Sequence, residues 1–144
     1  FARAILFEKD AAERFAGWGG SGMDRAGLAR WIDEHYRVTP DFPWRDHPRY
    51  AVFRHSGNRK WFALVMDLPR SKLGLAGDGR VEIVNLKCDP LLIGSLRGEP
   101  GFVPAYHMNR ERWISAALDG SVPDETLGML LAQSYAATAP KARR

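Results

Sequence analysis

The eight residues at positions 61–68 constrain the fold most, because they are almost wholly apolar and lie between two loops that contain glycine. A strand with one face in water alternates polar and apolar side chains, whereas a strand covered on both faces does not. Only Asp67 interrupts the apolar run. We therefore predict that residues 61–68 form a central strand, with other parts of the protein packed on both of its faces.

Two further strand-like segments flank this central run. Residues 50–55 alternate in the pattern of a half-buried strand, and Ser56-Gly57-Asn58 then supplies a turn. On the other side, a glycine-rich loop over residues 69–79 leads to a third strand at 81–87. Consecutive strands joined in this way predict an antiparallel meander.

A second group of strands follows later in the chain. Residues 101–107 and 112–118 are both strand-like, and Asn109-Arg110-Glu111 between them indicates a turn, so we predict a hairpin. Pro104 cannot donate a hydrogen bond to a neighbouring strand, which places the first of these strands at an edge of the sheet or at a bulge.

Helices are predicted before, between and after these strands. Residues 24–36 carry an apolar stripe at helical spacing, and Ser21 is the expected N-cap. Asp89-Pro90 combines a capping side chain with a proline suited to the first helical position. Ser121 is the expected cap of a last helix, which ends before Pro140.

The resulting order, α-β-β-β-α-β-β-α, predicts an α+β fold in which helices pack on an antiparallel sheet. Residues 23–140 form the predicted domain. We expect residues 1–22 to be a helix and a Gly-rich linker that end an upstream region, and residues 141–144 to be a basic tail.

Charge alone does not identify a partner. The chain has 21 basic and 17 acidic residues, and Lys141, Arg143 and Arg144 account for three of the basic ones, which leaves 18 against 17. The body is therefore nearly neutral, which is weak support for a polyanionic partner.

Cys88 is the only cysteine, so no disulfide framework or four-cysteine zinc site can form, and a cytoplasmic location is expected. No apolar run approaches the ~20 residues of a membrane-spanning helix, so no membrane partner is expected.

Several short motifs occur in order along most of the chain: Phe42-Pro43-Trp44, Lys60-Trp61-Phe62-Ala63-Leu64, Arg70-Ser71-Lys72-Leu73-Gly74, Val84-Asn85-Leu86-Lys87-Cys88-Asp89-Pro90 and Pro104-Ala105-Tyr106-His107-Met108-Asn109. In these motifs the chain resembles the MmcQ/YjbR family. The resemblance implies a CyaY-like, "double wing" fold whose topology is similar to that of type III secretion chaperones. It also implies DNA binding, and it implies no catalytic residues.

Polar and aromatic residues from the meander and the hairpin would converge on one sheet face or its rim if these two units lie side by side. Lysine and arginine would contact phosphates, while an amide or indole would contact sugar or base. Taken singly, each has an ordinary structural explanation: an asparagine in a turn, a tryptophan in the core, a basic residue in solvent. The candidate DNA-binding residues are Arg54, Lys60, Arg70, Lys72, Lys87, His107, Asn109, Arg110 and Trp113.

Three functional hypotheses follow. The first is a non-enzymatic binding module for double-stranded DNA, and the second is a protein-interaction or chaperone-like adaptor with an exposed apolar patch or a dimer contact. The third is a small-molecule enzyme, which would need a deep pocket joining His107, Asn109 and Lys87. We expect no cofactor and no metal, because none of the four histidines has metal-ligand spacing and the glycine loop matches no phosphate-binding motif.

Overall fold

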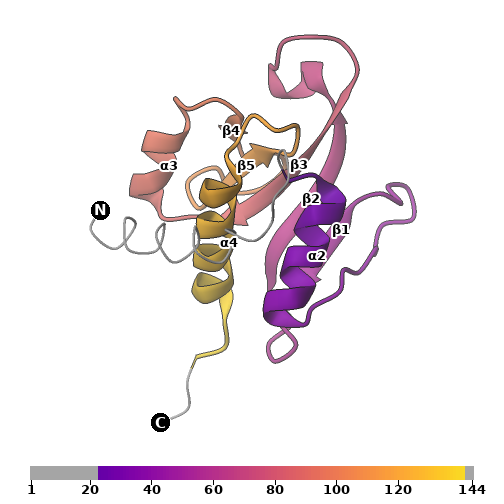
Figure 1. Cartoon of the computed structure of the whole chain (residues 1–144), viewed down its shortest axis with the longest axis vertical. Coiled ribbons are helices and arrows are strands. Elements are labelled where there is room, and N and C mark those ends of the chain that lie inside the picture. The colour runs from indigo at the N-terminus through magenta and orange to yellow at the C-terminus, as the bar shows by residue number, and fades with distance from the viewer. Residues whose placement is uncertain (1–22, 142–144) are drawn as a thin grey trace.

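Five strands form one antiparallel sheet in the computed structural model, which describes residues 23–141 (Figure 1). The spatial order is β1-β2-β3-β5-β4, so the meander and the hairpin join where β3 pairs with β5. Both predicted units are confirmed, and Pro104 lies in the edge strand β4 as expected. The strands are β1 (Ala51–Arg54), β2 (Trp61–Pro69), β3 (Arg80–Lys87), β4 (Phe102–Pro104) and β5 (Trp113–Ala117).

Three helices accompany the sheet in the described residues, and α2 and α4 lie across the same side of it (Figure 1). The predicted order α-β-β-β-α-β-β-α is confirmed, and the class is α+β. The helix expected within residues 1–22 lies outside the described residues. None of the helices in residues 23–141 is both long and apolar enough to cross a membrane. The helices are α2 (Arg25–Tyr36), α3 (Pro90–Leu96) and α4 (Asp124–Thr138), and a short 3-10 turn, η1 (Arg70–Leu73), follows β2.

Local capping explains where the helices begin. Asp24 caps α2 by accepting a hydrogen bond from the Gly27 N–H at 2.8 Å, in the place predicted for Ser21. Asp89 caps α3 as predicted. The prediction for Ser121 is wrong: α4 starts after Pro123 without a side-chain cap. Ser121 lies two residues before this N-cap position, and its hydroxyl donates to the Asp119 carboxylate.

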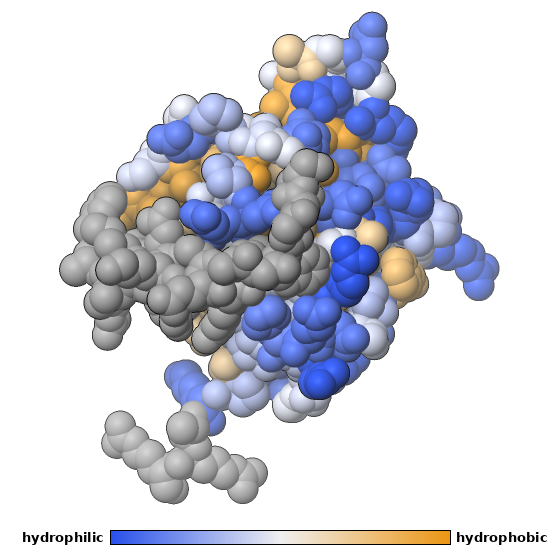
Figure 2. Space-filling view, in the orientation of Figure 1, coloured by the Kyte–Doolittle hydropathy of each residue, from blue (hydrophilic) through white to orange (hydrophobic). Residues whose placement is uncertain are grey.

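The main core lies between the sheet and its helices. Trp31 of α2, Phe53 of β1 and Phe62 of β2 are almost fully buried there. Tyr36 and Tyr135 join α2 to α4 by stacking their rings 3.8 Å apart, nearly parallel. Figure 2 shows this side of the molecule, with a hydrophilic outer surface over α2 and hydrophobic surface near α3.

A serine of α4 completes the pairing of two strands. The register of β2 and β3 ends at Ala63 and Leu86. Beyond it, the buried Ser134 hydroxyl accepts from the Lys87 N–H at 2.9 Å and donates to the Phe62 carbonyl at 2.5 Å. The helix is thereby tied to both central strands at a fixed position along their length.

A second apolar cluster lies on the opposite face of the sheet. Its members Val52, Leu64, Met66 and Ile83 come from β1, β2 and β3. Within residues 23–141, no hydrophobic residue of α2, α3 or α4 packs on this cluster. It is covered by partly buried side chains from loops, strand ends and η1: Trp44, Tyr50, Trp61, Leu73, Leu75, Tyr106 and Met108. The prediction that the central strand is covered on both faces is therefore confirmed, with a thin layer of large side chains forming the second cover.

Candidate binding site

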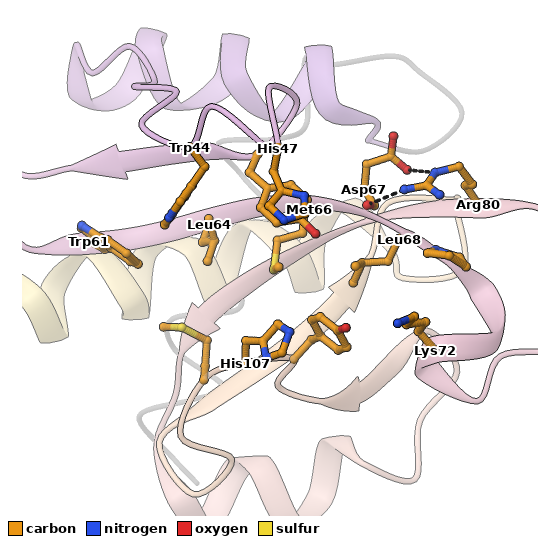
Figure 3. Close-up of a pocket in the computed structure, with 14 residues that line it drawn as sticks. Trp44, His47, Trp61, Leu64, Met66, Asp67, Leu68, Lys72, Arg80 and His107 are labelled. Atoms are coloured by element: carbon orange, nitrogen blue, oxygen red, sulfur yellow. Dashed lines mark hydrogen bonds and ion pairs between the residues drawn. The ribbon is translucent and has the colours of Figure 1, made fainter.

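The cover of the second cluster is hollowed into a pocket of about 480 Å³, which we call the aromatic pocket (Figure 3). Four segments that are distant in sequence form its walls: the loop before β1, strand β2, the η1–β3 segment and the loop between β4 and β5. The lining residues are Trp44, His47, Tyr50, Trp61, Leu64, Met66, Asp67, Leu68, Pro69, Lys72, Arg80, Tyr106, His107 and Met108.

Aromatic rings in mutual contact form much of the wall. Trp44 meets Trp61 edge to face, with ring centroids 5.5 Å apart and an interplanar angle of 89°. Trp44 meets Tyr50 in a similar way at 6.2 Å, and His47 stacks on Tyr50 at 4.4 Å with only 6° between the planes. Because each ring is held by another, the wall is preorganised rather than a set of independent side chains.

The loop that carries Trp44 is fastened to the edge of β1. Asp41 and Val52 exchange two backbone hydrogen bonds of 2.8 and 2.9 Å across an isolated bridge. The Asp41 carboxylate also accepts from Arg54 at 3.0 Å and from Arg59 at 3.3 Å. These contacts hold the loop against the sheet just before it reaches Trp44.

The opposite wall is positioned by two polar residues buried in the sheet. Asn85 of β3 and Ser115 of β5 are neighbours in the register, and the Ser115 hydroxyl donates to the Asn85 amide oxygen. Asn85 donates to the Tyr106 carbonyl at 3.1 Å, and Ser115 accepts from the Tyr106 N–H at 3.2 Å. Both backbone groups of Tyr106 are therefore held, and the next residue, His107, has a left-handed backbone with φ of 57°.

One end of the pocket is charged. Arg80 donates to Asp67 at 2.9 Å, and Arg49 also reaches Asp67, at 3.2 Å. Lys72 lies at the same end (Figure 3), is exposed, and makes no ion pair with a carboxylate of residues 23–141. Burial, aided by the neighbouring Tyr106, raises the pKa of the Tyr50 phenol above its ordinary value, so this phenol stays protonated at neutral pH.

The nine residues predicted for DNA binding are only partly brought together. Lys87 and Trp113 are register partners and therefore lie side by side on one face of the sheet. Arg54 lies over the Trp61 ring at 5.4 Å, and it is already paired with Asp41. His107 and Lys72 line the aromatic pocket, but the other seven do not.

The remaining candidates lie in η1 and in loops. Arg70 donates to the Ala76 carbonyl and to Asp119, and so stabilises its own loop. Partial burial alone would raise the pKa of the Asp119 carboxyl, but hydrogen bonds from Ser121 and Arg70 hold that pKa below its ordinary value. Asn109 accepts from the Glu111 N–H at 2.9 Å, which is the turn role that its sequence position also indicated. Lys60 and Arg110 are exposed.

The sequence interpretation missed the aromatic wall itself. Trp44, Tyr50 and Tyr106 appeared only within family motifs or strand patterns, although two of them belong to otherwise irregular segments with prolines nearby. Large aromatic residues in irregular segments have no helix or strand pattern that would place them in the core. That mismatch was the available signal for a separate site.

Comparisons with known proteins agree on the family of this chain. A family model described as YjbR matches residues 33–137. The uncharacterized protein YyaQ of Bacillus subtilis (strain 168) is 39% identical over 113 residues, which cover 78% of this chain and 96% of that protein.

Solved structures show the same fold. A crystal structure of a Pseudomonas syringae protein is 45% identical and covers 81% of this chain and 100% of its own, with a TM-score of 0.79. A solution NMR structure from Pseudomonas syringae is 43% identical, covers 85% of this chain and 98% of its own, and gives a TM-score of 0.76. A crystal structure of a Deinococcus radiodurans protein with a DUF419 domain is 27% identical and covers 81% of this chain and 78% of its own, with a TM-score of 0.60. With the family model spanning most of the described residues, the chain belongs to the YjbR (MmcQ/YjbR) family.

Proposed function

We propose that this protein is a non-enzymatic, cytoplasmic binding module that takes DNA on the sheet face opposite α2 and α4. The observation that supports this proposal is the combination of exposed or half-buried lysines with aromatic surface on and around that face. Lys72 lies at the charged end of the aromatic pocket, Lys87 lies beside Trp113, and Lys60 is in the β1–β2 turn. None of these three lysines pairs with a carboxylate within residues 23–141.

Ion pairs within the protein reduce the number of predicted residues that are available to contact phosphate. Arg54 and Arg70 are each engaged by a carboxylate, Asp41 and Asp119 respectively, so they contribute less to phosphate binding than their charge implies. The proposal therefore assigns phosphate contact to the three lysines. It leaves His107, Asn109, Arg110 and Trp113 as candidates for contact with sugar or base.

A salt titration tests the proposal directly. Three phosphate contacts predict a slope of about −2.7 in log affinity against log salt, or roughly a 40-fold loss between about 50 and 200 mM salt. Replacing Lys60 or Lys87 with Ala should each reduce the slope by about 0.9. Arg30→Ala, which removes an exposed cation of α2 on the other side of the sheet, is the matched control and should leave the slope unchanged. A wild-type chain that fails to bind duplex DNA at low salt would refute the proposal.

A protein-interaction adaptor is the second candidate, because two large hydrophobic side chains are exposed. Leu91 of α3 is 83% exposed and Phe42, in the loop before β1, is 57% exposed. Light scattering on the purified chain and on the Leu91→Glu variant tests this candidate. It predicts a dimer that the variant disrupts, and a wild-type monomer at high concentration would count against self-association.

A further inference from the structure

We infer that the aromatic pocket binds a planar heteroaromatic ring joined to a phosphate, which is the chemistry of a nucleotide. The ring can belong to a free mononucleotide or to an unpaired base of a nucleic acid strand. The free-nucleotide form of this inference does not rest on the proposed function, whereas the strand form deepens it.

The size and lining of the pocket suit a small planar ligand. Its volume of about 480 Å³ lies within the ~300–1,000 Å³ typical of sites for small ligands. Trp44, Trp61 and Tyr106 provide large flat surfaces, and each is only half-buried in the described structure. Apolar ring surface left partly in water gains from a guest ring that stacks on it.

The polar groups around the rings favour a heterocycle over a plain hydrocarbon. His47, His107 and the phenols of Tyr50 and Tyr106 line the pocket, and their side chains make no hydrogen bond to another residue of 23–141. Donors and acceptors at the edge of a heteroaromatic ring can pair with such groups. An aliphatic ligand would instead remove them from water without replacement partners.

The charged end provides a place for a phosphate. Lys72 has no carboxylate partner within the described residues, and Arg80 lines the same end of the pocket (Figure 3). Asp67 accepts from Arg80 and Arg49, and its register partner Glu82 accepts from Arg49 and Arg25. Three arginines therefore pair with these two carboxylates before a ligand arrives. An anion at this end therefore meets a net positive environment.

The walls are also suited to binding with little rearrangement. Asn85 and Ser115 hold both backbone groups of Tyr106, and the loop before Trp44 is bridged to β1. Met66 and Met108 line the same space, and their flexible thioether side chains adapt to the outline of a guest. A preorganised site loses less free energy on binding than one that must first become ordered.

Calorimetric titration of the full chain with four probes tests the inference. The probes are adenosine 5′-monophosphate, adenosine, ribose 5-phosphate and a short oligodeoxyadenylate single strand. The inference predicts binding of the monophosphate or the strand with a Kd of about 1 mM or tighter. Adenosine and ribose 5-phosphate should each bind at least about tenfold more weakly, because each lacks one half of the recognised group. Binding of the strand alone identifies an unpaired base as the source, and binding of the monophosphate identifies a free nucleotide.

Two variants and a control locate the site. Lys72→Ala should weaken monophosphate or strand binding about tenfold and leave adenosine binding unchanged. Trp44→Ala should weaken the ligands that carry a ring by about tenfold, and thermal unfolding shows whether this variant remains folded. Lys141→Ala should bind as wild type does. Because Lys72 is exposed, its replacement by alanine should leave the fold intact. The Lys72→Ala variant therefore still tests the site if Trp44→Ala unfolds.

The outcomes separate this inference from the proposed function. Absence of binding to both the monophosphate and the strand overturns the inference, even if duplex DNA binds with a steep salt dependence. Equal binding of ribose 5-phosphate, or unchanged affinity in a folded Lys72→Ala variant, also overturns it. Conversely, nucleotide binding that needs both ring and phosphate, without any binding of duplex DNA, supports the inference and refutes the proposed function.

Discussion

Replacing Ser134 with alanine should destabilise the protein far more than the loss of one hydroxyl from a surface helix would. Ser134 is fully buried and its hydroxyl bridges the Lys87 N–H of β3 and the Phe62 carbonyl of β2. Alanine has almost the same size but can neither accept nor donate a hydrogen bond. The variant therefore deprives two backbone groups of a partner while it leaves the apolar packing nearly unchanged.

The magnitude follows from that geometry. A buried polar group left without its partner costs about 1–3 kcal/mol, so two such groups give about 2–6 kcal/mol. This is a large part of the ~5–15 kcal/mol by which most domains are stable. By contrast, Ser71→Ala removes the hydroxyl of an exposed serine in η1, and a change within about 0.5 kcal/mol is expected there.

Urea unfolding, followed by tryptophan fluorescence, measures the difference between the two variants. With a slope of about 1–3 kcal/mol per molar urea, a loss of about 3 kcal/mol lowers the midpoint by about 1–3 M. Amide exchange should also be faster at Lys87 in Ser134→Ala, because that N–H has lost its acceptor. A midpoint for Ser134→Ala equal to that of Ser71→Ala would refute the idea that this hydroxyl completes the β2–β3 pairing.

Three further predictions concern other buried groups. Asn85→Ala should cost about 2 kcal/mol in urea unfolding and accelerate amide exchange at Tyr106, because it removes the donor to the Tyr106 carbonyl and the acceptor of a buried serine hydroxyl. Burial lowers the pKa of His55 below its ordinary value, so the unfolded chain binds a proton more readily than the folded protein does. The free energy of unfolding should therefore decrease below about pH 6.5, by at most ~1.4 kcal/mol per pH unit. In the His55→Gln variant, this pH dependence should be absent from the urea midpoints. Burial also raises the pKa of the Cys88 thiol to about 11, so thiol labelling at pH 8 should be slow in the folded protein and fast in urea, and rapid labelling of the native chain would contradict this.

Much of the fold was predictable because local chemistry determines it. The apolar run of β2 requires cover on both faces, and Pro104 is compatible with an edge strand but not with a central one. Asp89-Pro90 begins α3 because capping and proline geometry act within four residues. Ser121 was predicted wrongly because α4 begins two residues later than a Ser121 cap requires, and the geometry of the preceding loop determines that start.

The site was less predictable because it depends on pairings between distant residues. Lys72 and His107 line one pocket although 35 positions separate them, and only the sheet order brings their segments together. The ion pair between Arg54 and Asp41 likewise requires the loop before β1 to lie back along that strand. A list of basic residues therefore cannot distinguish a cation that is available to a ligand from one that is already paired.

Both borders of the sheet are poor templates for an added strand. At one border, Asp41 already occupies backbone groups of Val52. At the other, β4 is three residues long and ends in a proline. Short or proline-containing margins discourage two copies from joining their sheets and discourage an extended peptide from being recruited by main-chain bonding. A partner is therefore recognised through side chains rather than through main-chain hydrogen bonds at the sheet edges. Substitutions of those side chains can change selectivity without disturbing the sheet.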